Sequence, residues 1–489
     1  MQTKMKKIIL LIIFTLYLFI VTSVNVNATS YNYSEYLQAI EAPEAMIVKR
    51  IIASEDIIDD EGKPIVFGNL KDVFVLESET LGTRIYLLDS TNNRIIVLDE
   101  QFEYIRQYPR KEDLIVPPGG ELNINYILKS PSGIFVTESS IYVADTEGER
   151  LAIFTHNWGL RKSIKNPDDP TFENITFKPL KVAVDKNERI YVVASNIFEG
   201  IIDFNPDYTF NRYIGASSQT QSVWEKILSL IVSREQSSKR GLNLAITYNN
   251  ITIDQGGFIY ALSNRASGKP VRKINSKGSD VLKQKGYGLV LGDYQIYSEF
   301  SNFVDITVGM SETYSVLDKT MARIFTYDFE GRLLYISGGS SIFRIPEALA
   351  YFDENLLVVD SSNKNLVILE PTEFGHQVNI ATNAYYNNNY EEAALEWEKV
   401  LKLNTNYFPA YGGIGKAQYR QGLYKEAMEN FKLATDIYNY SAAYKEYRTQ
   451  KLEHILPYVL ITSFIGIIAL MAGSVIKRIK VSKVEGGDD

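Results

Sequence analysis

The chain of 489 residues contains no cysteine and only three histidines, His156, His376 and His454. The lack of cysteine excludes disulfide bonds, thiolate catalysis and cysteine-ligated metals. Two of the three histidines fall in a C-terminal stretch with helical periodicity, so a histidine-based site elsewhere could use only His156. This argues against lyases and amidating enzymes, whose chemistry relies on histidine side chains.

Positive charge is also scarce. The 51 Lys and Arg residues are outnumbered by 59 Asp and Glu, which gives a formal net charge of -8. Binding to a phosphate backbone needs concentrated basic side chains, so this balance disfavours a nucleic-acid partner. Hydrophobic residues make up 45% of the chain, which is enough for packed cores, and the length suggests about three domains.

The segment IYLLDSTNNRIIVLDE, residues 85–100, holds two short apolar runs around a polar cluster. The runs are too short for helices and rich in β-branched residues, and the cluster between them consists of turn formers. The pattern recurs five times downstream, giving six copies. The polar residues that close the first strand of each copy align as Asp89, Asp145, Ser195, Ser263, Asp318 and Asp360.

Each copy belongs to a unit of up to four strands. A further strand precedes most copies, as LKDVFV does at residue 70, and another follows most of them, as FEYIRQY does at residue 102. Four-stranded units repeated about every 40–50 residues, with extra length in loops, are typical of a radial β-propeller. We therefore predict an all-β, six-bladed propeller over residues 45–372.

The last unit has no fourth strand of its own, because Pro371 and helical sequence follow its third. A lone strand, AMIVKRIIA at residues 45–53, precedes the first unit. We predict that this strand completes the sixth blade and closes the ring, which removes exposed sheet edges.

The repeats resemble those of the NHL family, in which an Ile-Tyr-Val strand ends in Asp and the strand after the turn opens with Arg. The resemblance covers roughly residues 45–370 and is best in the first two blades, whereas Ser195 and Ser263 depart from the pattern. In such turns a carboxylate accepts hydrogen bonds from backbone N–H groups. This structural role is expected for Asp89, Asp145, Asp318 and Asp360.

An alternative is a gluconolactonase-like propeller, a class of hydrolase that holds a divalent cation through carboxylate and amide oxygens and needs no histidine. Three or four such oxygens about 2.3–2.6 Å from one point on the propeller axis would favour that enzyme. Scattered side chains would favour a binding protein. Because the repeat aspartates are expected in turns, we predict no catalytic residue, no metal and no cofactor.

The N-terminus has the pattern of a secretory signal. Three lysines at residues 4–7 precede the apolar run 8–21, and Val-Asn-Ala at 26–28 offers a cleavage site. We predict a signal peptide over residues 1–28 that is cut after Ala28. The alternative is an anchor helix that is not cleaved.

A second apolar run, residues 455–476, is 22 residues long and carries no charge. At about 1.5 Å per residue it matches a hydrocarbon core of roughly 30 Å. The basic tail, residues 477–489, is then expected in the cytoplasm. With an export signal in front, residues 29–454 should face outward from a bacterial cell membrane, and an exported chain without cysteine suits a Gram-positive-type envelope.

From residue 374 the hydrophobic period becomes helical. YEEAALEWEKVLKLNTN from Tyr390 recurs as YKEAMENFKLATDIYN from Tyr424, an offset of 34. This resembles two tetratricopeptide repeats with a capping helix over residues 374–454. The alternative is a stalk that leads into the membrane. The resemblance implies a protein partner bound by a concave face that carries Thr382, Tyr385, Tyr386, Lys416, Tyr419 and Arg420.

The insertion at residues 218–241 predicts an amphipathic helix that either packs on a propeller face or serves as a lid or docking element. Taken together, these features predict a non-catalytic, membrane-anchored, extracytoplasmic binding or scaffold protein. Its partners would be proteins, for example those of an importer that handles carbohydrate. The competing prediction is the metal-dependent hydrolase.

Overall fold

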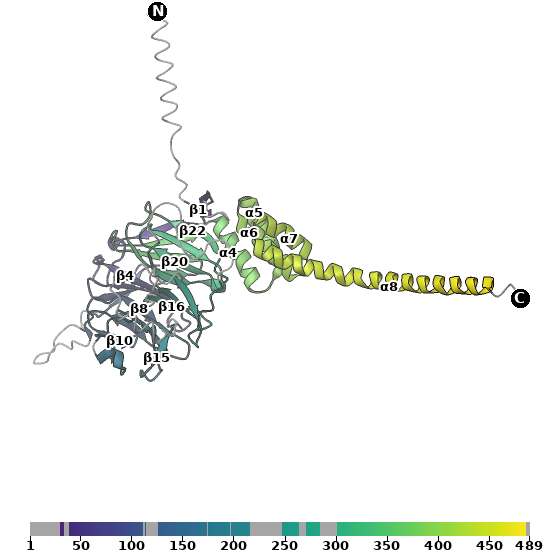
Figure 1. Cartoon of the computed structure of the whole chain (residues 1–489). Coiled ribbons are helices and arrows are strands. Elements are labelled where there is room, and N and C mark those ends of the chain that lie inside the picture. Colours follow the sequence, from purple (N-terminus) through teal and green to yellow (C-terminus); the bar gives the residue numbers. More distant parts are fainter. Residues whose placement is uncertain are drawn as a thin grey trace, which may run out of the picture. The chain divides into compact units, whose positions relative to one another are not determined.

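A computed structural model describes residues 30–33, 39–110, 113, 126–173, 175–195, 197–215, 247–263, 270–283 and 301–485. The predicted signal peptide and the insertion at 218–241 lie outside the described residues. The chain divides into two compact units, one ending at His376 and the other beginning at Gln377. Figure 1 shows the whole chain.

The first unit is a β-propeller of six antiparallel sheets, as predicted (Figure 1). The first strand of each sheet contacts the first strand of the next, and the contacts run from blade to blade until the circle closes. These six strands therefore surround the axis. Described strands, from the axis outward, are: blade 1, β4 (Leu70–Leu76), β5 (Arg84–Asp89), β6 (Arg94–Leu98) and β7 (Tyr104–Tyr108); blade 2, β8 (Gly133–Val136), β9 (Ile141–Asp145), β10 (Arg150–Phe154) and β11 (Leu160–Ile164); blade 3, β12 (Pro179–Val184), β13 (Ile190–Ala194), β14 (Ile201–Phe204) and β15 (Phe210–Ile214); blade 4, β16 (Tyr248–Ile253), β17 (Ile259–Ser263) and β18 (Val271–Ile274); blade 5, β19 (Phe303–Val308), β20 (Tyr314–Asp318), β21 (Arg323–Tyr327) and β22 (Leu333–Gly338); blade 6, β23 (Pro346–Phe352), β24 (Asn355–Asp360), β25 (Asn365–Pro371) and β3 (Met46–Ile52).

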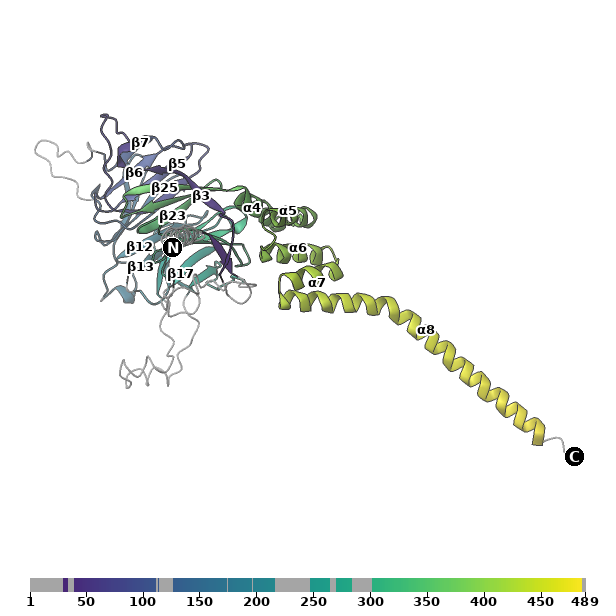
Figure 2. The same ribbon diagram turned by 90° about the horizontal axis from the view of Figure 1, so that it is seen from above.

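The ring closes as predicted, through the N-terminal strand. β3 pairs antiparallel with β25, from Met46 opposite Pro371 to Ile52 opposite Leu366 (Figure 2). Ile52 is fully buried in a core cluster shared by blades 1 and 6. Residues from the two ends of the propeller sequence thus complete one sheet.

A short hairpin precedes this closing strand and was not predicted. β1 (Tyr31–Tyr33) pairs with β2 (Ala39–Glu41). Ser30 and Asn32 donate side-chain hydrogen bonds to the carbonyls of Ile336 and Leu334 in β22, at 3.3 and 3.0 Å. The hairpin therefore covers part of the outer edge of blade 5, which would otherwise present unpaired backbone groups.

Blade 4 differs from the prediction at its outer strand. Its expected fourth strand, which begins at Asp280, is represented in the described part of the chain by a single bridge between Ile274 and Asp280. The residues that follow Lys283 up to position 300 lie outside the described ranges.

Five α-helices follow the propeller in the described residues, and the last four pack each against the next (Figure 2). Small residues allow the close approach that the repeat pattern implied. A Cβ on Gly413 would lie 2.4 Å from the Trp397 ring, and one on Gly415 would lie 2.8 Å from the Phe431 ring. The tetratricopeptide assignment itself stays a prediction. The helices are α4 (Glu373–Tyr386), α5 (Tyr390–Leu403), α6 (Phe408–Arg420), α7 (Tyr424–Leu433) and α8 (Ile437–Glu485).

Helix α8 is long and apolar enough to cross a membrane. It continues for 49 residues, so the capping helix and the predicted span at 455–476 form one element. Its start packs against α7, where Ala443 is fully buried. The fold class is therefore confirmed, with a six-bladed propeller followed by a helical segment that contains one long apolar helix.

Ring closure can be tested with two neighbours on β3. Ile52→Ala should lower the free energy of unfolding of the propeller by about 2–5 kcal/mol, because it leaves a cavity between blades 1 and 6. Ile51→Ala, at a side chain that is 48% exposed, should change it by less than about 1 kcal/mol. Urea unfolding of the full-length protein in detergent measures both. Equal effects would contradict closure by this strand.

Candidate functional site

Five of the six strands around the axis share an irregularity near their start. In these five the register with the next strand shifts by one residue. Such β-bulges redirect the side chains that follow them. In β8, Gly133 pairs with Ala144, which makes it the counterpart of Asp72 opposite Leu88. The equivalent positions in the six first strands are Asp72, Gly133, Lys181, Asn250, Asp305 and Ala348.

A buried ammonium group joins three of the blades at the axis. The Lys181 Nζ lies 2.6 Å from Asp72 Oδ1 and 3.3 Å from Asp305 Oδ1. These residues belong to blades 3, 1 and 5, and both carboxylates are almost fully buried. Lys181 thus connects strands that are not neighbours in the ring.

The remaining three blades join the same network. Asp72 Oδ2 accepts the Ile134 backbone N–H of blade 2 at 2.9 Å, and Asp305 Oδ2 accepts the Leu349 N–H of blade 6 at 2.7 Å. The Asn250 side-chain amide of blade 4 donates to Asp305 Oδ1 at 2.6 Å. Every blade therefore contributes a hydrogen-bonding group. We call Asp72, Lys181, Asn250 and Asp305 the axial cluster.

Gly133 leaves room for the lysine side chain. A Cβ at this position would lie 2.6 Å from the Leu180 carbonyl oxygen and 3.2 Å from Lys181 Cδ. Moving the backbone away from such a contact costs free energy. A larger residue at position 133 would therefore displace β12 or the lysine side chain.

Burial dominates the electrostatics of the axial cluster. It raises the pKa of Asp305 to about 6; Lys181 opposes this shift and the neighbouring Asp72 adds to it. For Lys181, burial lowers the pKa, but Asp305 and Asp72 together outweigh that effect and hold the pKa above its ordinary value. The lysine is therefore charged at neutral pH.

A second group of charged side chains lies beside the axial cluster. Its residue in β23 directly precedes Ala348, and its residue in β4 directly precedes Asp72. Glu347 of β23 binds Lys71 Nζ at 2.6 Å and Lys319 Nζ at 2.5 Å. Burial raises the pKa of Glu347, but hydrogen bonds from Lys319 and Lys71 outweigh it and lower the pKa overall. The lysine side chains are 36% and 32% exposed, so this group presents positive charge to solvent.

The four predicted repeat aspartates each end the second strand of their blade, next to the turn and not at the axis. Each is fully buried and accepts backbone N–H groups from the segment that leads into its blade, and two also bind the Arg that opens the next strand. Asp89 accepts from Gly68 N–H at 3.1 Å and Arg94 Nε at 3.2 Å; Asp145 from Lys129 N–H at 2.6 Å and Arg150 Nε at 2.7 Å; Asp318 from Asn302 N–H at 3.2 Å; and Asp360 from Arg344 N–H at 2.6 Å.

The alignment of Ser195 with these aspartates is wrong by one residue. Ala194 pairs with Pro179 as Asp89 pairs with Leu70. Blade 3 therefore has alanine at the position of these aspartates.

The six predicted partner-binding residues differ in accessibility. Thr382, Tyr385 and Lys416 are buried; the Thr382 hydroxyl donates to the Val378 carbonyl, and Lys416 Nζ lies 6.0 Å from the centre of the Tyr385 ring. The other three are accessible to a partner: Tyr386 and Tyr419 are partly exposed, and Arg420 is exposed.

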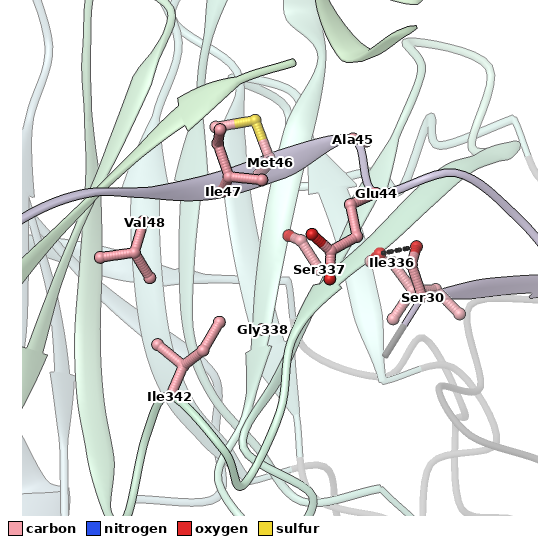
Figure 3. A pocket seen from close by; sticks show the side chains of 10 residues that line it. All are labelled: Ser30, Glu44, Ala45, Met46, Ile47, Val48, Ile336, Ser337, Gly338 and Ile342. Atoms are coloured by element: carbon pink, nitrogen blue, oxygen red, sulfur yellow. Dashed lines mark hydrogen bonds between the residues drawn. The ribbon is translucent and has the colours of Figure 1, made fainter. Parts of the chain in front are cut away.

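A pocket of about 170 Å³ lies between the outer strands β3 and β22 (Figure 3). Met46, Ile47 and Ile342 contribute apolar walls, and Glu44 is the one ionisable residue among its ten lining residues. This composition offers no pair of acidic and basic groups for catalysis.

The axial cluster does not fit a divalent cation. Within the described ranges, no group of three or more His, Cys, Asp or Glu residues is placed to hold a metal ion. Two carboxylates do converge at the axis, but on the ammonium group of Lys181. This cluster was not predicted from the sequence. The available signal was a polar residue at the third or nearby position of an otherwise apolar first strand, as in LKDVFV and PLKVAVD.

The raised pKa of Asp305 predicts that the stability of the folded protein falls as the pH rises. The folded-state value of about 6 exceeds the unfolded value of about 3.9, so the folded protein holds more protons between these values and loses stability as pH rises through 6. Relative to Asp305→Asn, the wild type should lose about 1 kcal/mol between pH 5 and pH 7. Urea unfolding of both proteins at both pH values measures this difference. A wild type that gains stability relative to the variant would contradict it.

No protein-family model matches the chain, and no curated protein matches it in sequence. Solved structures resemble it at low identity. Virginiamycin B lyase from Staphylococcus aureus is 12% identical, with 71% of this chain and 96% of that chain covered and a TM-score of 0.37. A gluconolactonase-like protein is 9% identical, with coverage of 70% and 97% and a TM-score of 0.40. Luciferin-regenerating enzyme is 10% identical, with coverage of 63% and 92% and a TM-score of 0.39. Similarity at this level concerns the fold alone and assigns no activity to this chain.

Proposed function

We propose that this chain is a non-catalytic, membrane-anchored scaffold whose propeller and helical repeats bind protein partners. The observation that carries the proposal is the axial cluster. The ammonium group binds both carboxylates, and each carboxylate also accepts a backbone N–H group. A general acid, a general base or a metal ligand must be able to reach a substrate, and these groups are already occupied.

Two histidines also have structural contacts. His156 Nε2 lies 2.9 Å from the Thr137 carbonyl oxygen, and His376 Nδ1 lies 2.6 Å from Glu354 Oε2. Neither pairing resembles a base poised beside a nucleophile. Both support a binding role over histidine-dependent chemistry.

In this proposal α8 crosses the membrane through residues 455–476. The apolar side chains of this part of α8 are exposed, and lipid would cover them. Residues 29–454 would lie outside the cell and 477–489 in the cytoplasm, in line with the basic tail.

The partner is best placed at or in the membrane. Ala443 is the last fully buried residue of α8, and the apolar run begins at Ile455. Twelve helical residues rise by about 18 Å, so the helical repeats lie close to the bilayer surface. A membrane-embedded transporter, such as a carbohydrate importer, is a partner of this kind.

Three side chains are the proposed contact residues, namely Tyr386, Tyr419 and Arg420. Tyr and Arg are among the residue types that contribute most to protein interfaces. The three belong to α4 and α6, which alternate with α5 and α7 along the array.

Site-specific photocrosslinking in intact cells tests this proposal. A photoreactive residue at position 386 or 420 should yield adducts with the same membrane protein, whereas one at the exposed Lys402 of α5 should not. Arg420→Glu should reduce the adduct formed from position 386 at least several-fold.

Equal labelling from position 402 would contradict the proposed surface. Hydrolysis of sugar lactones by the purified full-length protein with calcium, manganese or zinc would overturn the non-catalytic role, provided that Asp72→Asn abolishes the activity.

A further inference from the structure

The part of α8 that precedes its apolar run carries three basic residues at equal spacing, Lys445, Arg448 and Lys451. All three side chains are exposed. No ion pair joins any of them to another described residue. In the proposed topology they lie on the outward side of the membrane, where the positive-inside rule predicts no enrichment of basic residues. Their charge therefore needs another explanation.

The three basic side chains share one face of the helix. An α-helix turns by about 100° per residue, so Lys445 and Lys451 lie within about 60° of Arg448 around the helix axis. The same geometry places the two acidic residues of this segment, Glu446 and Glu453, about 140–160° from Arg448. Positive charge is thus gathered on one face, and the carboxylates lie on the opposite one.

This basic face is directed away from α7 and continues into the apolar run. Ala443, which is fully buried where α8 packs against α7, lies about 140° from Arg448. Tyr444, Leu452 and Ile455 lie within about 40° of Arg448, and their side chains are 49%, 54% and 51% exposed. Basic, aromatic and apolar side chains on one helix face suit the boundary between lipid head groups and acyl chains.

The heights of the basic residues match the head-group layer. Lys451 and Arg448 precede Ile455 by four and seven residues, which places them at most about 6 and 10 Å above the hydrocarbon core. The head-group region adds about 5–8 Å to each side of that core. Long Lys and Arg side chains can bend toward this layer. The Lys451 Nζ also lies 5.0 Å from the centre of the Tyr447 ring.

We propose that the face formed by Lys445, Arg448 and Lys451 binds the phosphate groups of anionic phospholipids in the outer leaflet. The phosphates supply the negative charge that this face lacks, and the apolar run holds the face at the depth where they lie. The inference rests on the proposed membrane crossing of α8 but does not require the protein partner. Anionic lipid would then hold the start of α8 at the bilayer surface.

Native mass spectrometry of the full-length protein in detergent tests the proposal, with phosphatidylglycerol and phosphatidylcholine added at equal concentration. The basic tail could also attract anionic lipid, so every protein compared carries the substitutions Lys477→Gln, Arg478→Gln, Lys480→Gln and Lys483→Gln. With no other change, this protein should bind phosphatidylglycerol in preference to phosphatidylcholine.

The further changes Lys445→Gln, Arg448→Gln and Lys451→Gln should weaken the affinity for phosphatidylglycerol by about five-fold or more, because each basic side chain near a membrane surface contributes about that factor. The exchange of Lys for Arg and of Arg for Lys at the same three positions should preserve the preference. An unchanged preference in the glutamine variant would overturn the proposal. If that variant instead loses the photoadduct formed from position 386, the basic face binds the protein partner and not lipid.

Lys402→Gln/Lys425→Gln/Lys432→Gln is the matched control. These lysines are exposed in α5 and α7, so the change in net charge is the same but lies outside the basic face, and the preference should persist. Equal loss in the control would reveal an effect of net charge alone and would also overturn the proposal. Release of the protein from membranes without detergent would refute the crossing of α8 and thus the proposed function. An embedded protein without lipid preference refutes this inference alone.

Discussion

The ion pairs of Lys181 with Asp72 and Asp305 are the interaction on which the centre of the propeller depends. Blades pack on one another through apolar faces, and apolar packing has little directional preference. The axial bonds are directional, and they join strands from every blade. A buried ion pair adds little net stability compared with apolar packing, but loss of one partner is severe. Its value here is therefore to specify how six similar sheets meet.

Much of the fold could be predicted because its signals are local. Strand periodicity and turn residues mark each blade, and the count of strands leaves only residues 45–53 to complete the sixth. The β1–β2 hairpin was missed because three-residue strands carry no periodicity, and its place depends on bonds to the distant β22. The error at Ser195 arose because its turn has no Asp, so the aligned residue was taken one position too late.

The functional site was harder to predict because its contacts join residues that are distant in sequence. The turn aspartates act within their own blade, so a local pattern suggests their environment, as the contacts of Asp89 illustrate. The axial cluster joins Asp72, Lys181 and Asp305, which are more than 100 residues apart in sequence, and only the closed ring brings them together. On the helical repeats, a family pattern indicated a face but not its burial, and tight helix packing covers Tyr385 and Lys416.

The pairing of β3 with β25 also has a consequence for biosynthesis. The ribosome makes β3 before any other blade strand, yet its partner emerges more than 300 residues later. During that interval β3 has an unsatisfied edge and the apolar side chains of Met46 and Ile52 lack their final environment. Contacts between such distant segments form slowly, and exposed strands invite aggregation. We therefore expect the incomplete chain to be prone to aggregation until the last blade strand has been made.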